Sequence, residues 1–510
     1  MTDFAGAIAE GYSFEGAAVE LGKGMHEGAV VAEAAVRIPL ATTNRHGLIA
    51  GATGTGKTKS LQVLAEQLSA AGVPVFAADV KGDLSGLLHP AEPDGPAQVR
   101  MEELGLAFEP AAFPVELLSL GGIGPGVPVR ATVSDFGPQL LAKILGANET
   151  QEQSLGLVFR YADENALPLL DLADLRALLT YLDSDEGKES LAGLGGVSSA
   201  TIGVLLRSLV AVEDGGGSEF FGEPQLEIAD LLRTAPDGRG VISCLELAAV
   251  QDKPALFSTA MMWLLAELFE QLPEEGDLAK PKLVFFFDEA HLLFDDATEA
   301  FLDSVVKTVR LIRSKGVGVF FVTQQPTDVP RDVLAQLGSR VQHALRAFTP
   351  EDADALRRTV RTYPTSEFYD LEQLLTSLGI GEAVVTILSE KGVPTPVVHT
   401  RMRAPASRMD VADDLAAAAA ASPLQAKYGT RVDAESARER LAERLEGSAE
   451  AAAGEKAETP RPERKRKKQK KPAAKPAGGD VITDFLGSKQ GKALQKEIAR
   501  GVFGLLKKRF

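Results

Sequence analysis

The sequence predicts an α/β protein with a doubly wound, mostly parallel sheet. Short apolar runs of strand length recur along the chain, and stretches with helical spacing separate several of them. This alternation is typical of a parallel sheet, because each crossover between parallel strands needs a connection of helical length. We expect strands at 36–40, 46–50, 73–78, 241–245, 283–287, 317–322, 341–348 and 383–388.

The composition is that of a folded globular chain. Of its 510 residues, 45% are hydrophobic and 25% are charged, and the formal net charge is −17. The single cysteine, Cys244, excludes an intramolecular disulfide and a metal site built from cysteines, which fits a reducing compartment. The first residues lack a secretory signal. No apolar run approaches the ~20 residues of a membrane span, so we expect a cytoplasmic protein without a transmembrane segment.

A glycine-rich loop between an expected strand and an expected helix carries the clearest functional signal. Residues 51–58 match GxxxxGK[ST], the pattern of a phosphate-binding loop. Glycines let backbone N–H groups turn toward phosphate oxygens, and the positive end of the following helix faces the same oxygens. We expect Lys57 to reach the β- and γ-phosphates and Thr58 to ligate Mg²⁺. The residues predicted to bind ATP are Gly51, Ala52, Thr53, Gly54, Thr55, Gly56, Lys57 and Thr58.

A pair of acids follows the apolar run 283–287. Asp288 at the end of this strand is predicted to hold Mg²⁺ beside Thr58, and Glu289 to orient or deprotonate the attacking water. The alternative is a strand end with two solvated acids. The position of the pair downstream of a phosphate-binding loop favours the metal and base roles.

Other polar residues at strand and helix ends are further candidates. Gln324 follows an apolar run and is expected to contact the γ-phosphate or the attacking water. Arg313 and Arg340 are candidates for an arginine that completes the site of a neighbouring subunit, although a surface ion pair is the commoner role of a single arginine. Asp79 and Lys81 end the second strand, at the edge where α/β sheets bind ligands, and either touch nucleotide or form a structural ion pair.

Three longer blocks extend these motifs. They read RHGLIAGATGTGKT at 45–58, VRLIRSKGVGV at 309–319 running into VTQQP at 322–326, and GSRVQHALRAFTP at 338–350. They resemble the HerA/FtsK superfamily of P-loop ATPases, and within it the bacterial HerA-like proteins of the YjgR type, over most of residues 10–445. The resemblance implies a RecA-like core, often assembled as a hexameric ring, in which ATP hydrolysis moves double-stranded DNA or another polymer.

The expected domain organisation places a helical insertion inside the ATPase core. Leucines at helical spacing mark the insertion, and a stretch rich in Ala, Glu, Lys and Pro marks a disordered basic linker near the end of the chain. The expected parts are core at 1–133, α-helical insertion at 134–235, core at 236–405, helical extension at 406–446, linker at 447–479 and an amphipathic terminal helix at 480–510.

Two functions from different classes stay open. The first is a Mg²⁺-dependent, ATP-driven motor that forms a homo-oligomer and acts on DNA. The second is an ATP-dependent switch or adaptor that recruits a protein partner or a membrane surface through its C-terminal tail. The family blocks favour the motor, as does the helix expected at 302–313, on which Arg310 and Arg313 share a face. The acidic body favours the adaptor, as does the chain before Gly51, which is too short for the β-barrel that precedes the core in HerA.

Overall fold

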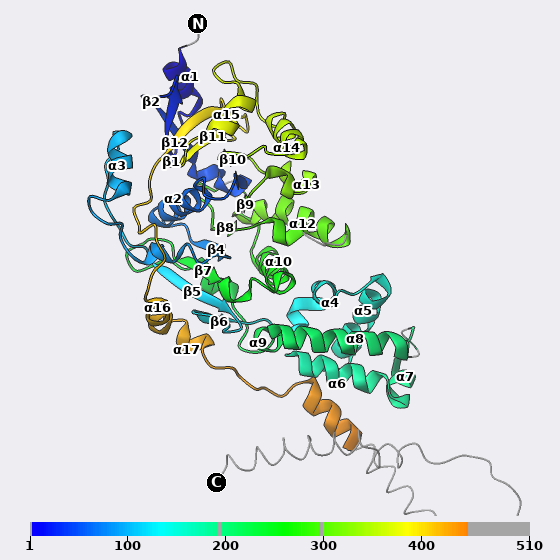
Figure 1. The fold of residues 1–510 in the computed structure, drawn as a ribbon. Helices are drawn as coiled ribbons and strands as arrows, with labels where there is room; N and C mark the ends of the chain where they lie inside the picture. Colours follow the sequence, from blue (N-terminus) through cyan, green and yellow to red (C-terminus); the bar gives the residue numbers. More distant parts are fainter. Residues whose placement is uncertain (1–2, 192, 194, 277, 295–298, 447–510) are drawn as a thin grey trace, which may run out of the picture. The chain divides into compact units, whose positions relative to one another are not determined.

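A mixed sheet of 12 strands runs through the computed structural model of the chain (Figure 1). The structure describes residues 3–191, 193, 195–276, 278–294 and 299–446. The expected basic linker at 447–479 and the expected terminal helix at 480–510 lie outside the described residues. Among the helices that are described, none combines the length and the apolar character needed to cross a membrane.

The strand order separates a parallel region from an antiparallel one. The order is β2-β1-β12-β11-β10-β3-β9-β8-β4-β7-β5-β6. The strands from β10 to β6 are parallel to one another, and their bounds are β10 (Ser339–Gln342), β3 (Gly47–Ala50), β9 (Val317–Thr323), β8 (Leu283–Phe287), β4 (Val75–Asp79), β7 (Ile242–Glu246), β5 (Val115–Leu120) and β6 (Val127–Val129). Antiparallel pairs add β11 (Glu382–Thr386), β12 (Val398–Met402), β1 (Ala18–His26) and β2 (Ala29–Pro39). The predicted fold class, an α/β protein with a mostly parallel sheet, is confirmed.

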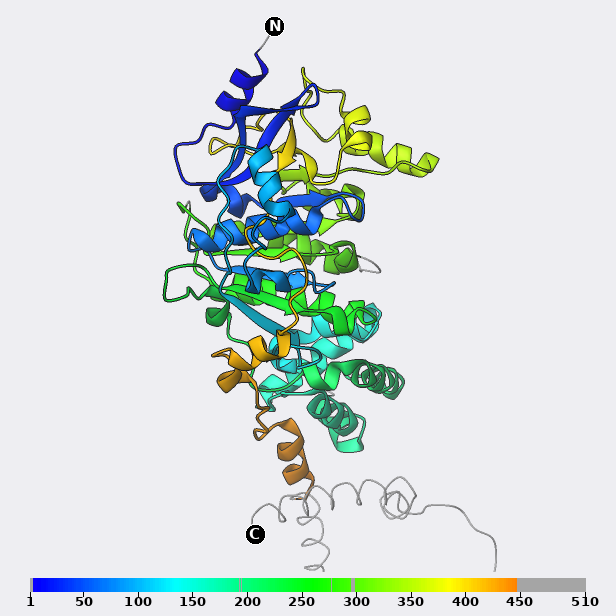
Figure 2. The same cartoon turned by 60° about the vertical axis from the view of Figure 1, so that its left-hand side comes forward.

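Helices cover both faces of the parallel strands (Figure 2). In β8, Phe285 and Phe287 belong to the core formed with α10 (Pro254–Gln271) and α12 (Glu299–Ile312). The alternate residue Phe286 belongs to the core on the opposite face, together with α1 (Phe4–Gly11) and α2 (Lys57–Ala70). Burial on both faces explains why β8 reads as a continuous apolar run without alternation.

The expected strand at 341–348 extends too far along the chain, because β10 ends at Gln342. The chain then leaves the sheet, and the Ala344 carbonyl accepts a hydrogen bond of 2.8 Å from the N–H of Ala52 in the glycine-rich loop. The residues after β10 therefore contact this loop. They also contact α15 (Leu371–Ser377), where the Leu345 N–H donates to the Leu375 carbonyl.

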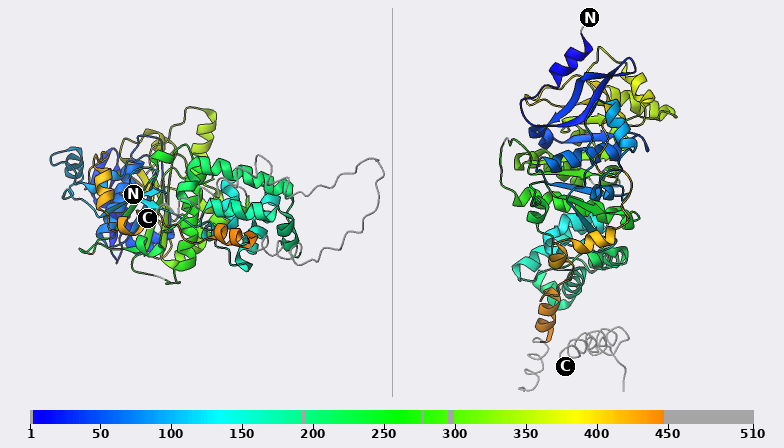
Figure 3. Two further views of the ribbon diagram at one scale, coloured as in Figure 1. Left: turned by 90° about the horizontal axis from the view of Figure 1, so that it is seen from below. Right: turned by 90° about the vertical axis from the view of Figure 1, so that its left-hand side faces the viewer.

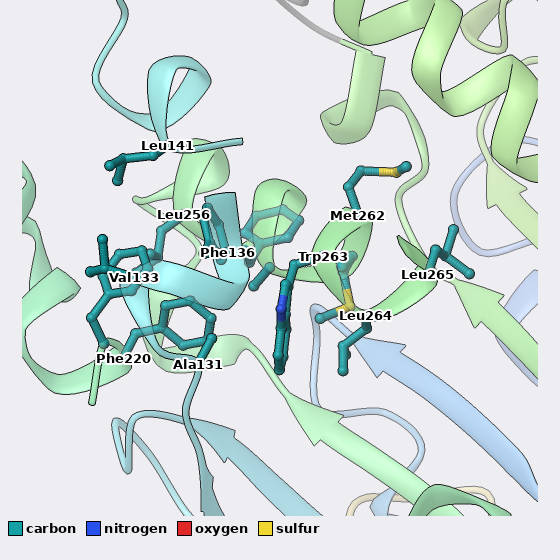
Figure 4. Packing of buried hydrophobic residues seen from close by; sticks show 14 of the residues in the cluster. Ala131, Val133, Phe136, Leu141, Phe220, Leu256, Met262, Trp263, Leu264 and Leu265 are labelled. Atoms are coloured by element: carbon teal, nitrogen blue, oxygen red, sulfur yellow. The ribbon is translucent and has the colours of Figure 1, made fainter. Parts of the chain in front are cut away.

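A group of helices lies between β6 and β7, beside the β6 edge of the sheet (Figures 1 and 3). These helices are α4 (Val133–Ile144), α5 (Glu149–Glu164), α6 (Leu172–Leu182), α7 (Asp185–Leu191), α8 (Ser199–Val212) and α9 (Ser218–Phe220). Figure 4 shows how α4 and α9 pack on α10. The Trp263 ring lies 6.3 Å from the Phe220 ring, which in turn lies 5.9 Å from the Phe136 ring. This apolar contact fixes the helical region to the sheet.

The chain after β12 forms an extended strap, defined here as residues 403–446. It crosses α2, continues through α16 (Leu415–Ala421) and α17 (Gln425–Tyr428), and is helical again at 437–446 (Figure 1). There the N–H of Ala437 donates to the carbonyl of Pro168 in the helical region, at 2.9 Å. The remaining helices are α3 (Pro96–Glu103), α11 (His291–Phe294), α13 (Arg331–Leu334) and α14 (Pro350–Val360).

Candidate nucleotide site

The glycine-rich loop joins the carboxyl end of β3 to the first turn of α2. Gly54 and Gly56 have φ angles of +80° and +116°, which residues with a β-carbon rarely adopt. At Gly51 a β-carbon would lie 2.5 Å from the β-carbon of His343, so the loop packs directly against the residue that follows β10. The first N–H groups of α2 have no partner within the helix and form an anion-binding end.

Lys57 bends back over this loop. Its Nζ donates to the Gly51 carbonyl at 2.7 Å and to the Ala52 carbonyl at 3.3 Å. Burial lowers the pKa of Lys57, and the negative charges of Glu289 and Asp288 oppose that shift. A buried ammonium bonded to neutral carbonyl oxygens is a strong attractor for the phosphates of a nucleotide.

The sheet order brings the other motif residues to the same edge. Because β9 lies between β3 and β8, its carboxyl end lies between the glycine-rich loop and the acid pair. Gln324 follows β9 directly and is exposed, whereas Asp288 and Glu289 follow β8 and are buried. The Gly51 N–H donates to the Thr323 carbonyl at 3.2 Å, which ties the loop to the end of β9.

Asp288 has the environment of a metal ligand. Its pKa is raised to about 7, chiefly by burial and also by the neighbouring charges of Glu289 and Asp79, against the lowering effect of Lys81. A divalent cation beside this carboxyl would favour the charged form and relieve that repulsion. A carboxylate and the hydroxyl of Thr58, on the first turn of α2, are oxygen ligands of the kind that Mg²⁺ takes.

Glu289 adopts an unusual backbone conformation, with a φ of +48°. Its Oε1 forms an ion pair with Lys81 Nζ, and its Oε2 lies 3.4 Å from His291 Nδ1. Within the described part of the chain, Oε2 has no hydrogen-bond partner. A non-glycine residue in the left-handed region is uncommon and clusters at functional sites.

The two candidate arginines lie away from this loop. Arg313 precedes β9, so it lies at the amino ends of the parallel strands, whereas the loop lies at their carboxyl ends. There, burial together with the charge of Arg313 lowers the pKa of His46 to about 4. Arg340 is held within the chain, since its Nη1 donates to Thr362 Oγ1 at 2.7 Å and its guanidinium lies 5.7 Å from the Tyr363 ring centre.

An arginine that motif reasoning did not select lies beside the loop. Arg346 is exposed, and its Nη2 is 3.5 Å from the Thr53 carbonyl. On the same side the N–H of Gly381, just before β11, donates to the Thr55 carbonyl at 3.0 Å. The only signal of Arg346 in the sequence was its place in the RAFTP part of the third family block.

His343 links α2 to the antiparallel part of the sheet. Its Nε2 is 2.8 Å from Ser60 Oγ, and its Nδ1 is 2.8 Å from the Glu382 carbonyl oxygen. Burial lowers the pKa of His343 to about 4, so the ring is neutral at physiological pH. The ring therefore joins α2 to the start of β11 behind the loop.

The model of the family described as "Helicase HerA-like C-terminal" matches residues 26–509. The chain belongs to this family. The resemblance to the HerA/FtsK superfamily is thereby confirmed. No curated protein matches the chain.

Solved structures of TrwB share the fold of this HerA-like chain at low sequence identity. The unbound form of TrwBΔN70, a bacterial conjugative coupling protein, has a TM-score of 0.52 and 16% identity, over 80% of this chain and 95% of that chain. TrwB in complex with the non-hydrolysable ATP analogue ADPNP has a TM-score of 0.51 and 16% identity over the same shares. VirB4 of Thermoanaerobacter pseudethanolicus has a TM-score of 0.48 and 16% identity, over 77% and 98%. A further TrwB structure contains ADP and Mg²⁺.

Proposed function

We propose that this HerA-like chain is a Mg²⁺-dependent ATPase that works as a homo-oligomeric motor on DNA. One observation carries the proposal. The proposal is supported by the strand order β3-β9-β8, in which the glycine-rich loop, Gln324 and the acid pair follow the carboxyl ends of adjacent strands. These are the groups that ATP hydrolysis needs: a phosphate cradle, a metal-binding carboxylate, a base and a polar group for the water.

Each residue has a part in this chemistry. The loop from Gly51 to Thr58 binds the phosphates, and Lys57 neutralises charge on the β- and γ-phosphates. Thr58 and Asp288 would hold Mg²⁺, which supplies further charge neutralisation on the phosphate oxygens when it is bound. Glu289 accepts the proton of the attacking water, and Gln324 orients that water.

The position of Arg313 supports an oligomer. It lies at the amino ends of the parallel strands, whereas the loop lies at their carboxyl ends, so it does not reach the nucleotide of its own chain. Its side chain is exposed and is available to a neighbouring subunit. An arginine supplied by a neighbouring subunit stabilises the charge that develops during phosphoryl transfer. Arg340 is the weaker candidate for that role, because Thr362 and Tyr363 already engage its guanidinium.

A second candidate function is an ATP-dependent switch, and the strap favours it. On α2, Glu66 Oε2 accepts the N–H of Ala406 at 2.8 Å, and Glu66 Oε1 accepts the N–H of Ser407 at 2.9 Å. At its far end, the strap contacts the helical region through Ala437. Movement of α2 with nucleotide state would therefore reach the helices beyond β6, whether or not the protein moves a polymer.

Steady-state ATP hydrolysis with Mg²⁺ separates the two functions. The full chain is assayed alone and with double-stranded DNA, single-stranded DNA or RNA, and Glu289→Gln is run beside it. The motor predicts strong stimulation by double-stranded DNA that disappears in the variant. Slow hydrolysis that no polymer changes would contradict the motor and favour the switch.

A further inference from the structure

The loop after β4 places a second lysine in the nucleotide site. The carboxylate of Asp79 organises this loop: Oδ1 accepts the N–H groups of Lys81 at 3.2 Å and Gly82 at 2.8 Å, and Oδ2 accepts that of Leu84 at 2.7 Å. Asp79 itself is 1% exposed. The buried Asp79 carboxylate therefore fixes the backbone of the loop from which the Lys81 side chain extends.

The Lys81 ammonium engages the residue that the proposed chemistry uses as its base. Lys81 Nζ pairs with Glu289 Oε1, and the side chain of Glu289 is 7% exposed whereas that of Lys81 is 39% exposed. Burial alone would lower the pKa of Lys81, but the hydrogen bond and charge of Glu289 raise it. In this arrangement the ammonium holds Oε1 of the base and competes with water for that oxygen, while Oε2 has no hydrogen-bond partner among the described residues.

The loop after β4 lies at the same end of the parallel strands as the phosphate-binding loop, because β4, β8, β9 and β3 are adjacent in the sheet. The positive charge of Lys81 also adds to the lowering of the pKa of Lys57, whose Nζ donates to the carbonyl of Gly51, the first residue of that loop. Two ammonium groups near one another repel, and an anion placed between them removes the repulsion. The γ-phosphate of ATP carries such a charge, whereas ADP lacks that group.

We propose that Lys81 is a second γ-phosphate-binding lysine, which exchanges Glu289 for a γ-phosphate oxygen when ATP binds. The exchange releases Oε1 of Glu289 when ATP binds, so that both oxygens of the base can then act on the attacking water. Lys81 is thus a positioning residue for the base as well as a ligand for the substrate. This inference rests on the proposed function of the same site.

The exchange predicts that the contribution of Lys81 to ATP affinity depends on whether Glu289 is present, which a merely structural ion pair does not predict. In the wild-type chain the new contact with the γ-phosphate is offset by the loss of the contact with Glu289. In Glu289→Gln the charged pair is absent, so the contact with the γ-phosphate is gained without that loss. A hydrogen bond between charged groups then contributes about tenfold or more to affinity.

Equilibrium binding of the non-hydrolysable analogue ADPNP and of ADP, each with Mg²⁺, tests the inference. The chains compared are wild type, Lys81→Met, Glu289→Gln and the double variant. We expect Lys81→Met to weaken ADPNP binding about tenfold in the Glu289→Gln background and clearly less in the wild-type background. We expect ADP binding to change by less than about threefold throughout. Lys280→Met is the matched control, because Lys280 bonds the Ala71 and Gly72 carbonyls beyond the far end of α2.

The outcomes separate the inference from the function on which it rests. Equal effects of Lys81→Met on ADPNP and ADP, or no difference between the two backgrounds, would overturn the exchange while leaving nucleotide binding intact. Failure of the wild-type chain to bind either nucleotide would overturn the proposed function itself.

Discussion

Asp79 and Glu246 are register partners at the carboxyl ends of the adjacent parallel strands β4 and β7. Glu246 is 3% exposed, and its Oε1 has no hydrogen-bond partner among the described residues. Burial and the charge of Asp79 raise the pKa of Glu246 to about 8. Because backbone N–H groups satisfy Asp79, Glu246 is the member of the pair that carries a proton at neutral pH.

This pair predicts a pH-dependent stability that Glu246→Gln removes. The pKa of Glu246 is higher in the folded than in the unfolded chain, so its contribution to stability is complete below the unfolded value and is lost as pH rises toward 8. Relative to the variant, the wild-type free energy of unfolding should fall by about 1.4 kcal/mol per pH unit across that window. Urea denaturation at pH 5.5, 7 and 8.5 measures the difference, and parallel profiles would contradict the assignment.

The strap predicts a stability effect far from the phosphates. Glu66 is 4% exposed and is the acceptor for the N–H groups of Ala406 and Ser407. Glu66→Ala leaves these donors without an acceptor, so we expect a loss of about 2–4 kcal/mol in the free energy of unfolding. Glu164→Ala removes an exposed ion pair with Arg160 and is the control, with an expected loss below about 1 kcal/mol. Equal losses in the two variants would show that the strap is not held as described.

The role of Arg313 predicts complementation between two inactive variants. Arg313→Ala keeps its own phosphate-binding loop, and Lys57→Ala keeps its arginine, so each is expected to lose most ATP hydrolysis alone. Mixed oligomers contain sites with an intact loop and a neighbouring arginine, and we expect them to recover a measurable fraction of the activity. The hydrolysis rate against mixing ratio gives the result.

Arg340→Ala is the matched arginine control in the same assay. Since Arg340 is bonded within its own chain, this variant should keep hydrolysis within about threefold of wild type. If mixing recovers nothing, and Arg340→Ala is instead the inactive arginine variant, the assignment to Arg313 is wrong.

The central parallel strands and the neighbouring β11 could be predicted from the sequence, but β5, β6, β1, β12 and most of β2 could not. β8 is a run of apolar residues because both its faces are buried, and β9 reads in the same way. β12 instead alternates buried and half-buried residues over only five positions, too few to distinguish a strand from a loop. The helix α10 is buried around most of its surface, Trp263 included, and so lacks the periodicity that marks an amphipathic helix.

The motif residues of the site were predictable because their spacing is local in the chain. The contacts that join them were not. Lys81 and Glu289 are 208 residues apart, and Arg346 and Thr53 are 293 residues apart. Only the strand order brings such residues together, and no pattern in a single sequence specifies which lysine or arginine faces the loop. From the sequence, Lys81 could be expected at the carboxyl ends of the strands, where ligands bind, but its ion pair with Glu289 could not.

Phosphate release from ATP by the full chain tests whether the chain hydrolyses ATP at the loop from Gly51 to Thr58. Wild type and Lys57→Ala are assayed side by side, with and without Mg²⁺ and with double-stranded DNA present. We predict release that requires Mg²⁺ and falls by about 100-fold or more in the variant, because Lys57 neutralises the transferred phosphate. Release that is equal in the two chains, or that does not require Mg²⁺, would contradict hydrolysis at this loop.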